Sequence, residues 1–236
     1  MEQIIPGALY LVSTPIGNLG DITYRAVFIL NAVDLIAAED TRTTSILLDK
    51  YDIKKRMLPY YSYNQQYQTP KIIEHLKNGR SVALVSDAGT PGILDPAYEL
   101  VTSCIREKIP IIPVPGPSAI LAALTASGLP SNRFVFEGFL PIKKGRKTKI
   151  QKLVTEERTM IFYESVHRIL KTTEELLAQF GDRSCVMARE LTKKFEEFFR
   201  GTLSDLVNHI KSKPPKGEIV LIVAGFKSSK KSDEDN

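Results

Sequence analysis

The sequence predicts an α/β fold built from two α/β domains, and three observations carry this prediction. Short apolar segments typical of strands alternate with amphipathic segments typical of helices along almost the whole chain. The strand segment 81–86 (SVALVS) is continuously apolar between its two serines, as in parallel sheets covered on both faces. A VPGP turn at 114–117 interrupts the alternation, which then resumes. We therefore expect domains at 1–113 and 114–226, followed by a charged, disordered tail at 227–236.

The expected elements follow from apolar periodicity. Up to residue 114 we expect strands at 8–13, 34–39, 81–86 and 111–114, and helices at about 23–32, 41–51 and 98–107, with a further helix at 117–127 beyond the boundary. In the second domain we expect strands at 134–138, 159–165, 184–190, 195–201 and 217–225, with helices between them. The apolar residues of the helix at 166–180 share one face and are expected in the core: Val166, Ile169, Leu170, Leu176, Leu177 and Phe180.

Composition restricts the class of protein. The 236 residues are 43% hydrophobic and 25% charged, which is ordinary for a globular protein. No apolar run reaches the roughly 18 residues that a membrane span needs, and the N-terminus lacks the basic start of a signal peptide, so we expect a cytoplasmic protein. Two cysteines and three scattered histidines argue against a metal centre. A net charge of +5 mildly favours a polyanionic partner, although many enzymes are slightly basic.

Four irregular loops, three of them rich in Gly and Pro, follow the strands of the first domain. They are STPIGNLGD at 13–21, AEDTR at 38–42, SDAGTPGILDP at 86–96 and PGPSA at 115–119. In open α/β sheets, ligands bind beyond the carboxyl ends of the strands. One such loop is readily explained as a turn, but four at equivalent positions favour one shared cleft.

The loops favour a ligand without phosphate. None has the GxxxxGK[ST] pattern of a phosphate-binding loop, and STPIGNLGD matches GxGxxG only loosely. A loop that offers backbone donors and an Asp but no Lys suits a ligand that carries hydroxyls and amines. S-adenosylmethionine (SAM) is one such ligand. The residues alone leave SAM as one plausible ligand.

The order and spacing of several motifs closely resemble one family. The motifs include VSTPIGNLGDIT, AEDTRTT, VALVSDAGTPGILDP, PVPGPSA, FEGFLP, ARELTKKFEE and GEIVLIV, and they span about residues 6–225. This pattern is similar to the bacterial 16S ribosomal RNA (cytidine-2′-O)-methyltransferases of the tetrapyrrole methylase superfamily. The resemblance implies two α/β domains with SAM in the cleft between them, a homodimer, and methylation of a cytidine ribose in the decoding region of 16S rRNA within the small ribosomal subunit.

The resemblance also implies site residues. Those expected to contact SAM are Ile16, Gly17, Asp87, Ala88, Gly89, Thr90, Ile93, Ser118, Ala119, Glu164 and Glu218. Methyl transfer to a hydroxyl needs alignment and an acceptor for the proton. Candidate bases are Glu39 and Asp40, then Asp87, Lys193 and Glu196; each has an alternative role in an ion pair or a cap, and Asp40 could cap the helix that follows it.

Cationic residues are the candidates for contact with RNA. The run KKGRKTK supplies five cations in seven positions, at Lys143, Lys144, Arg146, Lys147 and Lys149. Phosphate contact and a solvated helix face are both compatible with such a run. Arg42 and Arg189 are expected to pair with the SAM carboxylate, with RNA phosphate or with surface carboxylates. Tyr60, Tyr61 and Tyr63 are candidates for base stacking or for core and rim positions.

Two other functions compete with this interpretation. A tetrapyrrole C-methyltransferase of the same superfamily is expected to carry GxGPGD in the first loop and GGDP in the third, where this chain has TPIGN and DAGTP. A non-catalytic RNA-binding or ribosome-assembly module is a candidate from another class. The intact glycine loops argue against it, and absence of SAM binding would favour it.

Overall fold

The computed structural model describes residues 3–227, and the chain divides into two compact units, Met1–Ser118 and Ala119–Asn236. The expected boundary after residue 113 is wrong, because it cuts through strand β5 (Ile111–Val114). Val114 pairs with Val12 of strand β1 (Leu9–Val12) and so belongs to the first sheet. The expected disordered tail, apart from Lys227, lies outside the described residues.

The first unit contains a sheet of five parallel strands in the order β3-β2-β4-β1-β5. Its elements, besides β1 and β5, are η1 (Leu19–Asp21), α1 (Tyr24–Ala32), β2 (Leu35–Ala38), α2 (Thr41–Lys50), β3 (Met57–Pro59), α3 (Gln65–Lys77), β4 (Val82–Val85) and α4 (Ala97–Arg106). The parallel arrangement brings the carboxyl ends of all five strands to one edge of the sheet. The four irregular loops described above leave from that edge.

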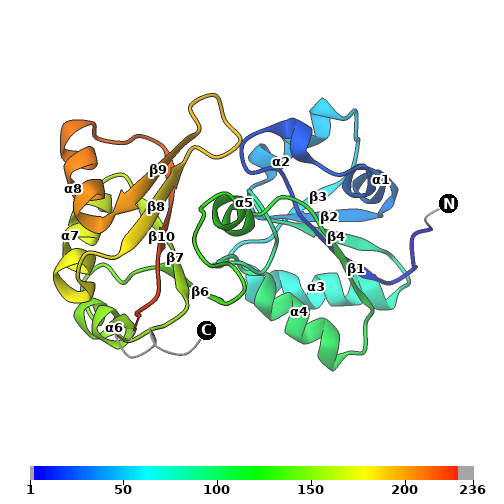
Figure 1. Ribbon diagram of the computed structural model, residues 1–236. Coiled ribbons are helices and arrows are strands. Elements are labelled where there is room, and N and C mark those ends of the chain that lie inside the picture. The colour runs from blue at the N-terminus through cyan, green and yellow to red at the C-terminus, as the bar shows by residue number, and fades with distance from the viewer. Residues whose placement is uncertain (1–2, 228–236) are drawn as a thin grey trace, which may run out of the picture. The chain divides into compact units, whose positions relative to one another are not determined.

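Helices cover both faces of the first sheet, as Figure 1 shows. Helices α1 and α2 pack on one face, where Ile29, Leu30 and Leu48 meet the side chains of Tyr10 and Ile36. Helices α3 and α4 pack on the other face through residues that include Ile72, Leu76, Leu100 and Cys104. Burial on both faces explains why β2 and β4 are apolar at every position.

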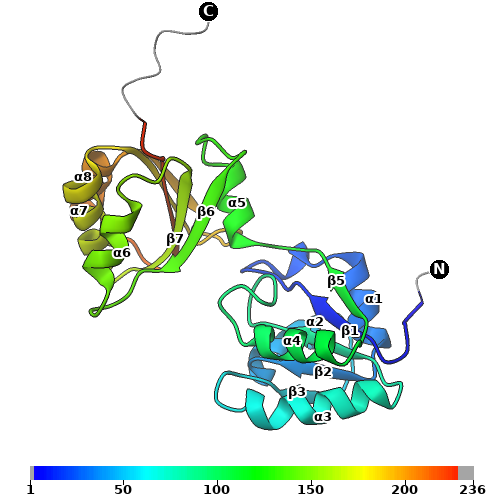
Figure 2. The ribbon, with the colours of Figure 1, turned by 90° about the horizontal axis from the view of Figure 1, so that it is seen from below.

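The second unit contains a mixed sheet in the order β6-β7-β10-β8-β9. Its elements are α5 (Ala119–Thr125), β6 (Phe134–Phe139), α6 (Arg146–Leu153), β7 (Thr159–Ser165), α7 (Ile169–Phe180), β8 (Ser184–Arg189), β9 (Glu197–Thr202), α8 (Leu203–Ser212) and β10 (Glu218–Val223). Strands β6 and β7 are parallel, whereas β10 is antiparallel to both β7 and β8. Helices α6, α7 and α8 lie on one face of this sheet and α5 lies on the other (Figure 2).

The predicted core face of α7 is confirmed. Ile169, Leu176 and Phe180 are buried in the core of the second unit. The other three predicted residues, Val166, Leu170 and Leu177, pack against that core with partial exposure. The core thus forms where the helical periodicity of the sequence indicated.

The alternation of strands and helices is confirmed, but β3 and α3 were not expected from the sequence. Strand β3 has three residues and ends in Pro59, so it carries little apolar signal. Helix α3 is polar and contains Pro70, a residue that normally interrupts helices. It forms because Thr69, Ile72 and Leu76 are buried against the sheet. Across residues 3–227, no helix combines the length and apolarity that membrane crossing requires.

Candidate functional site

Three loops of the first unit, those after β1, β4 and β5, are joined by hydrogen bonds. Thr14 and Gly89 exchange backbone hydrogen bonds, with N···O distances of 2.9 Å from Thr14 and 3.0 Å from Gly89. The Ser13 hydroxyl donates to Oγ1 of Thr90 at 3.1 Å, and the Thr90 hydroxyl donates to the carbonyl of Pro117 at 3.3 Å. These loops, separated by tens of residues in the sequence, therefore meet at one place, as predicted.

Gly89 lies where these loops meet and needs to be a glycine. Its φ is +82°, in the left-handed region that side chains rarely adopt. A Cβ there would lie 3.5 Å from Cγ2 of Ile16 and 3.8 Å from the Pro117 carbonyl oxygen. Gly89 thus lets backbone atoms of the SDAGTPG loop be approached closely. This supports the predicted role of Gly89, Ile16 and their neighbours in holding a ligand.

The loop containing Gly89 is braced by Asp95. The Asp95 carboxylate accepts hydrogen bonds from the backbone of Gly92 at 2.8 Å and of Ala97 at 3.0 Å. Two residues lie between Gly92 and Asp95. Leu94 has a left-handed backbone with φ +67°, and the side chain of Ile93 is 43% exposed. The loop is therefore shaped by its own acidic residue, and the predicted SAM contact Ile93 presents apolar surface outward.

The remaining predicted cofactor residues in these loops lie at or near the surface. Ala88 and Gly17 are exposed, and Thr90 is half-buried. Ser118 and Ala119 are half-buried and are the last residue of the first unit and the first of the second. The predicted cleft between the domains stays a prediction.

Three carboxylates gather where β2 and β4 end. The backbone N–H of Asp87 donates to Oε2 of Glu39 at 3.2 Å, and the backbone N–H of Asp40 donates to Oδ1 of Asp87 at 3.0 Å. These bonds connect the AEDTR loop to the SDAGTPG loop. The fourth predicted loop thus joins the other three.

The environments of Glu39 and Asp87 favour proton acceptance. Burial, together with the nearby charges of Asp87, Asp95 and Asp40, raises the pKa of Glu39 in spite of the hydrogen bond from Asp87. Burial likewise raises the pKa of Asp87. A carboxylate with a raised pKa is a stronger base at neutral pH than an ordinary one. Glu39 is the better candidate base, because it is half-buried beside the glycine loop.

Asp40 has a structural role, and its role as a catalytic base stays a prediction that this geometry does not favour. Its Oδ1 accepts a hydrogen bond from the backbone of Arg42 at 2.8 Å and caps helix α2. Its Oδ2 lies 2.6 Å from Nη2 of Arg42. The hydrogen bonds from Arg42 lower the pKa of Asp40 to about 2, which makes it a weak base. The Arg42 side chain is 89% exposed and thus accessible to a partner.

In the second unit, Glu164 lies in a buried polar network. Its side chain is 1% exposed, and its carboxylate accepts hydrogen bonds from the Thr172 hydroxyl at 2.6 Å and from the backbone of Ser165 at 2.9 Å. Arg168 approaches the same carboxylate at 3.3 Å. These internal partners give Glu164 a structural role, and its predicted contact with SAM has no support in this geometry.

Lys193 is held as a cation, and its role as a proton acceptor stays a prediction that this geometry does not favour. Its Nζ lies 3.0 Å from Oε1 of Glu190 and 2.9 Å from Oε2 of Glu218. Burial lowers the pKa of Lys193, but hydrogen bonds to Glu218 and Glu190 outweigh this and leave the pKa above its usual value. Glu218, a predicted SAM contact, is 80% exposed and engaged in this pair. Glu196 is also engaged, since it accepts a hydrogen bond from the backbone of Thr192 at 2.6 Å.

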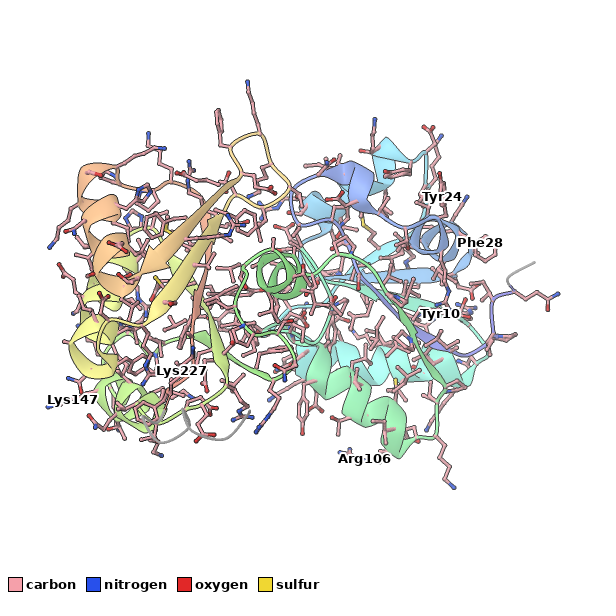
Figure 3. The ribbon with its side chains drawn as sticks, viewed as in Figure 1. Tyr10, Tyr24, Phe28, Arg106, Lys147 and Lys227 are labelled. Atoms are coloured by element: carbon pink, nitrogen blue, oxygen red, sulfur yellow. The ribbon has the colours of Figure 1, made fainter. Side chains whose placement is uncertain are left out.

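The basic run 143–149 separates into buried and exposed cations. Arg146 is buried, and its guanidinium donates to Glu175 at 2.6 Å, Thr172 at 2.7 Å and the Pro141 carbonyl at 3.1 Å. Its prediction as an RNA contact is therefore wrong. Lys149 pairs with Glu137. The exposed cations of the run are Lys143, Lys144 and Lys147, and Figure 3 labels Lys147 on the surface of α6.

The tyrosines near β3 also separate by burial. Tyr60 is fully buried, and its hydroxyl shares a hydrogen bond with Thr69 at 2.9 Å, so it has a core role. Tyr61 is 42% exposed and Tyr63 is 93% exposed, which leaves these two available for stacking. Arg189, a candidate for pairing with SAM or RNA, instead forms an ion pair with Glu197, with its Nε 2.7 Å from Oε2.

Sequence reasoning missed Ser13, Thr14 and Ser86, which hold the loops together. The Thr14 hydroxyl donates to the Ser86 carbonyl at 3.2 Å. The sequence signal that could have identified them is the presence of hydroxyl residues directly after two strands, Ser13 and Thr14 after β1 and Ser86 after β4. Within residues 3–227, no group of three His, Cys, Asp or Glu side chains could hold a metal ion.

Comparison with solved structures and family models gives the class of protein. Residues 8–207 match the model of the Tetrapyrrole (Corrin/Porphyrin) Methylases. A cobalt precorrin-4 methyltransferase, CbiF, aligns with a TM-score of 0.68 at 17% identity and covers 92% of this chain and 95% of its own. A uroporphyrin-III C-methyltransferase from Thermus thermophilus, complexed with S-adenyl homocysteine, aligns with a TM-score of 0.64 at 18% identity, covering 91% of this chain and 96% of its own. The fold is that of the tetrapyrrole methylases.

Comparison with curated sequences identifies the branch of this class. "Ribosomal RNA small subunit methyltransferase I" of Synechocystis sp. is 51% identical over 221 residues, covering 93% of this chain and 79% of the relative. The protein of the same name from Thermotoga maritima is 48% identical over 219 residues, covering 93% of this chain and 99% of the relative. The chain belongs to the ribosomal RNA small subunit methyltransferase I family, within the tetrapyrrole methylases, which confirms the resemblance seen in its motifs.

Proposed function

We propose that this protein is a SAM-dependent methyltransferase that methylates the ribose 2′-hydroxyl of a cytidine in 16S rRNA. The observation that carries the proposal is 48–51% identity, over 93% of the chain, to proteins named as small subunit ribosomal RNA methyltransferases. The proposed acceptor is the rRNA within the small ribosomal subunit. The proposed working form is a homodimer in the cytoplasm.

The junction of loops around Gly89 fits SAM. The ligand is a cation with an amino acid and a nucleoside, and it needs backbone and hydroxyl partners more than it needs lysines. When bound, it supplies a methyl group already activated by the attached sulfonium. The left-handed backbone at Gly89 allows close approach, Ile16 and Ile93 supply apolar contact, and Thr90 supplies a hydroxyl. These residues would bind and align the donor, which supplies much of the rate enhancement in such a transfer.

Glu39 is the proposed acceptor of the 2′-hydroxyl proton. Its raised pKa and its position beside the SDAGTPG loop support this role. The Asp87 backbone N–H holds one oxygen, Oε2, of the Glu39 carboxylate at 3.2 Å. This bond orients the carboxylate so that its other oxygen remains available to the substrate hydroxyl.

Exposed cations supply a surface for RNA phosphates. Lys143, Lys144 and Lys147 are exposed in the second unit, and the Arg42 guanidinium is exposed in the first. Tyr61 and Tyr63 lie on the chain after β3 and present rings to solvent. Phosphate contacts by these cations would position the RNA, and stacking on exposed rings would hold an unpaired base.

The experiment that tests the function is methyl transfer from radiolabelled SAM to three acceptors in parallel. The acceptors are small ribosomal subunits that lack this modification, naked 16S rRNA, and uroporphyrinogen. The site of the label in RNA is mapped by resistance to alkaline cleavage, because a 2′-O-methyl group removes the hydroxyl that attacks the adjacent phosphate.

The three acceptors give different outcomes. Label at one cytidine in the subunit establishes the proposed activity on the assembled particle. Label in naked RNA alone would support RNA methylation but show that free rRNA, and not the assembled subunit, is the substrate. Label in uroporphyrinogen alone overturns the proposal in favour of tetrapyrrole C-methylation, and no transfer together with no SAM binding favours a non-catalytic RNA-binding module.

A further inference from the structure

The second unit contains a cavity of about 740 Å³ that the proposed chemistry does not use. It lies beside the chain entering β6, the start of β7, the start of β8 and the residues after β10. Its volume falls within the range of about 300–1,000 Å³ that is typical of sites for small ligands. It is large enough for a nucleotide and much larger than a single water site.

The charged residues that line this cavity are mostly cationic. Four carry positive charge, namely Arg133, Arg158, Arg183 and Lys227, and two carry negative charge, namely Glu157 and Asp182. Asp182 is engaged by Ser204, whose backbone and hydroxyl donate to its carboxylate at 2.8 Å and 2.7 Å. Arg158 is paired with Glu156 at 2.7 Å. The charge left for a ligand is therefore positive.

Arg183 carries a charge with no carboxylate to balance it. Its Nε donates to the carbonyl of Phe180 at 3.2 Å, and its Nη2 donates to the carbonyl of Val154. Its Nη1 is buried and has no hydrogen-bond partner, and no carboxylate lies within 4.0 Å of the guanidinium among the described residues. Burial lowers the pKa of Arg183, as expected for a cation removed from water without a counter-ion. An anion nearby would stabilise such a group.

The walls around Arg183 are fixed. The rings of Phe180 and Phe226 lie 4.7 Å and 5.5 Å from its guanidinium carbon. The backbone N–H of Phe226 donates to the carbonyl of Glu156 at 2.6 Å. A Cβ at Gly225 would lie 1.9 Å from the Glu157 carbonyl oxygen, so the chain can pass there only with glycine. The cationic cavity is thus a rigid feature of the fold.

Two of its cations remain accessible and unpaired. Arg133 and Lys227 are exposed, and neither makes an ion pair within residues 3–227. Lys227 is labelled in Figure 3. Two exposed cations and one buried cation that line the cavity match the demands of a phosphodiester, which is anionic and accepts several hydrogen bonds.

We propose that this cavity binds a phosphate group of the substrate RNA, together with its nucleotide, and so anchors the RNA on the second unit. The inference rests on the proposed function, since it assigns the phosphate to the RNA acceptor. Arg133 and Lys227 contact the phosphate, and Arg183 supplies a fixed positive charge behind it. Phosphate contacts of this kind position RNA without reading its sequence.

The test compares two double variants with equal loss of charge. The cavity variant is Arg133→Gln with Lys227→Gln, and the control is Lys152→Gln with Lys216→Gln, two exposed lysines of the same unit outside the cavity. Affinity for a labelled fragment of small subunit rRNA is measured by fluorescence anisotropy at several salt concentrations. We expect the cavity variant to lose about 10-fold in affinity and to lower the salt slope by about 2, and the control to change affinity by less than about 2-fold. Equal behaviour of the two variants would overturn the proposal.

A second set of measurements identifies the source of the phosphate. Inorganic phosphate and cytidine monophosphate are titrated against the protein while the Nε–H signal of Arg183 is followed by NMR, and each is then used to compete with the RNA fragment. Competition by cytidine monophosphate in the wild type but not in the cavity variant supports an RNA site. A shift of the Arg183 signal by phosphate, with RNA affinity unchanged in the cavity variant, would show a free-anion site and contradict the proposal.

SAM binding and methyl transfer separate this proposal from the proposed function. SAM affinity of the cavity variant, measured by calorimetry, is expected to equal that of the wild type. If RNA affinity falls in the cavity variant while the wild type methylates no RNA, the cavity assignment stands and the proposed function fails. If the wild type methylates the subunit and the cavity variant binds RNA as the control does, the function stands and the cavity assignment fails.

Discussion

The acidic residues of the two units are held in different ways. In the first unit, Glu39 and Asp87 lie at strand ends, accept hydrogen bonds from backbone N–H groups, and have raised pKa values. In the second unit, the pKa of Glu190 is lowered by a hydrogen bond from the backbone N–H of Glu218 and by Lys193, and the pKa of Glu197 is lowered by Arg189 and Lys213. A carboxylate bound to a cation is stabilised in its charged form and is a poor base. Glu39 and Asp87 are therefore better suited to proton transfer than Glu190 and Glu197, whose charged forms are stabilised.

The two sheets account for this difference. In the first sheet all strands are parallel, so the loops at their carboxyl ends converge and bring Glu39 and Asp87 together. In the second sheet β10 runs antiparallel between β7 and β8, so its ends lie beside charged residues of both neighbours. Glu218 at the start of β10 thus reaches Lys193, which follows β8. Sheet topology thus places Glu218 beside Lys193.

The largest expected effect comes from Gly89→Val in the first unit. A branched side chain at φ +82° is strained and meets Ile16 and the Pro117 carbonyl. We expect SAM affinity, measured by calorimetry, to fall by at least about 1,000-fold. Gly79→Val is the matched control, because Gly79 has φ +77° with nothing within 4 Å of the added Cβ. Wild-type SAM affinity in the Gly89 variant would remove this loop from the site.

In the second unit, Glu164→Ala should act on stability. The change leaves Thr172 and Arg168 without their buried acceptor, and we expect a loss of about 3 kcal/mol in the free energy of unfolding, measured with urea. Glu174→Ala, which removes a partly exposed partner of Lys211, should cost less than about 1 kcal/mol. A loss of SAM affinity with unchanged stability would instead restore Glu164 as a cofactor contact.

Glu39→Gln tests the basic carboxylate of the first unit. Removing a general base should lower the rate of methyl transfer by about 100-fold, or about 2.7 kcal/mol in the barrier. In the wild type, Glu39 can accept a proton only when its carboxylate is deprotonated. The rate of methyl transfer should therefore fall as the pH drops through the pKa of Glu39, which is higher than that of an ordinary glutamate. This acidic limb should disappear in the variant. Glu74→Gln, an exposed change in α3, is the control, and equal rates for both variants would exclude Glu39 as the base.

The smallest effect is expected for Lys193→Gln in the second unit. Its ion pairs with Glu190 and Glu218 are partly solvated, so the loss in the free energy of unfolding should be about 0.5 kcal/mol. Lys193 is protonated at neutral pH because its pKa is raised, and the pH profile of methyl transfer should keep its shape. If the variant instead lost one pH-dependent part of that profile, Lys193 would again be a candidate base.

Elements with strong periodicity were predictable from the sequence, and those formed by tertiary packing were not. Helix α7 carries an apolar face that the structure buries as expected. Helix α3 has a weak face and contains Pro70, and it forms because the sheet buries Ile72 and Leu76. The boundary between the units was misplaced for a related reason. The VPGP turn begins inside β5, and only pairing with β1 shows that Val114 belongs to the first sheet.

By itself, the sequence determined the α/β alternation, the loops at the strand ends of the first sheet and the motifs that place the chain in its family. These features are local, since they depend on residue types within a few positions of one another. The tertiary structure alone decided which polar residue has which role. Burial and the charges of Asp87, Asp95 and Asp40 raise the pKa of Glu39, and Arg146 is buried where Glu175 and Thr172 pair with it. Burial and pairing depend on partners that only folding brings together, so no run of charged residues reveals in advance which of its members will remain free.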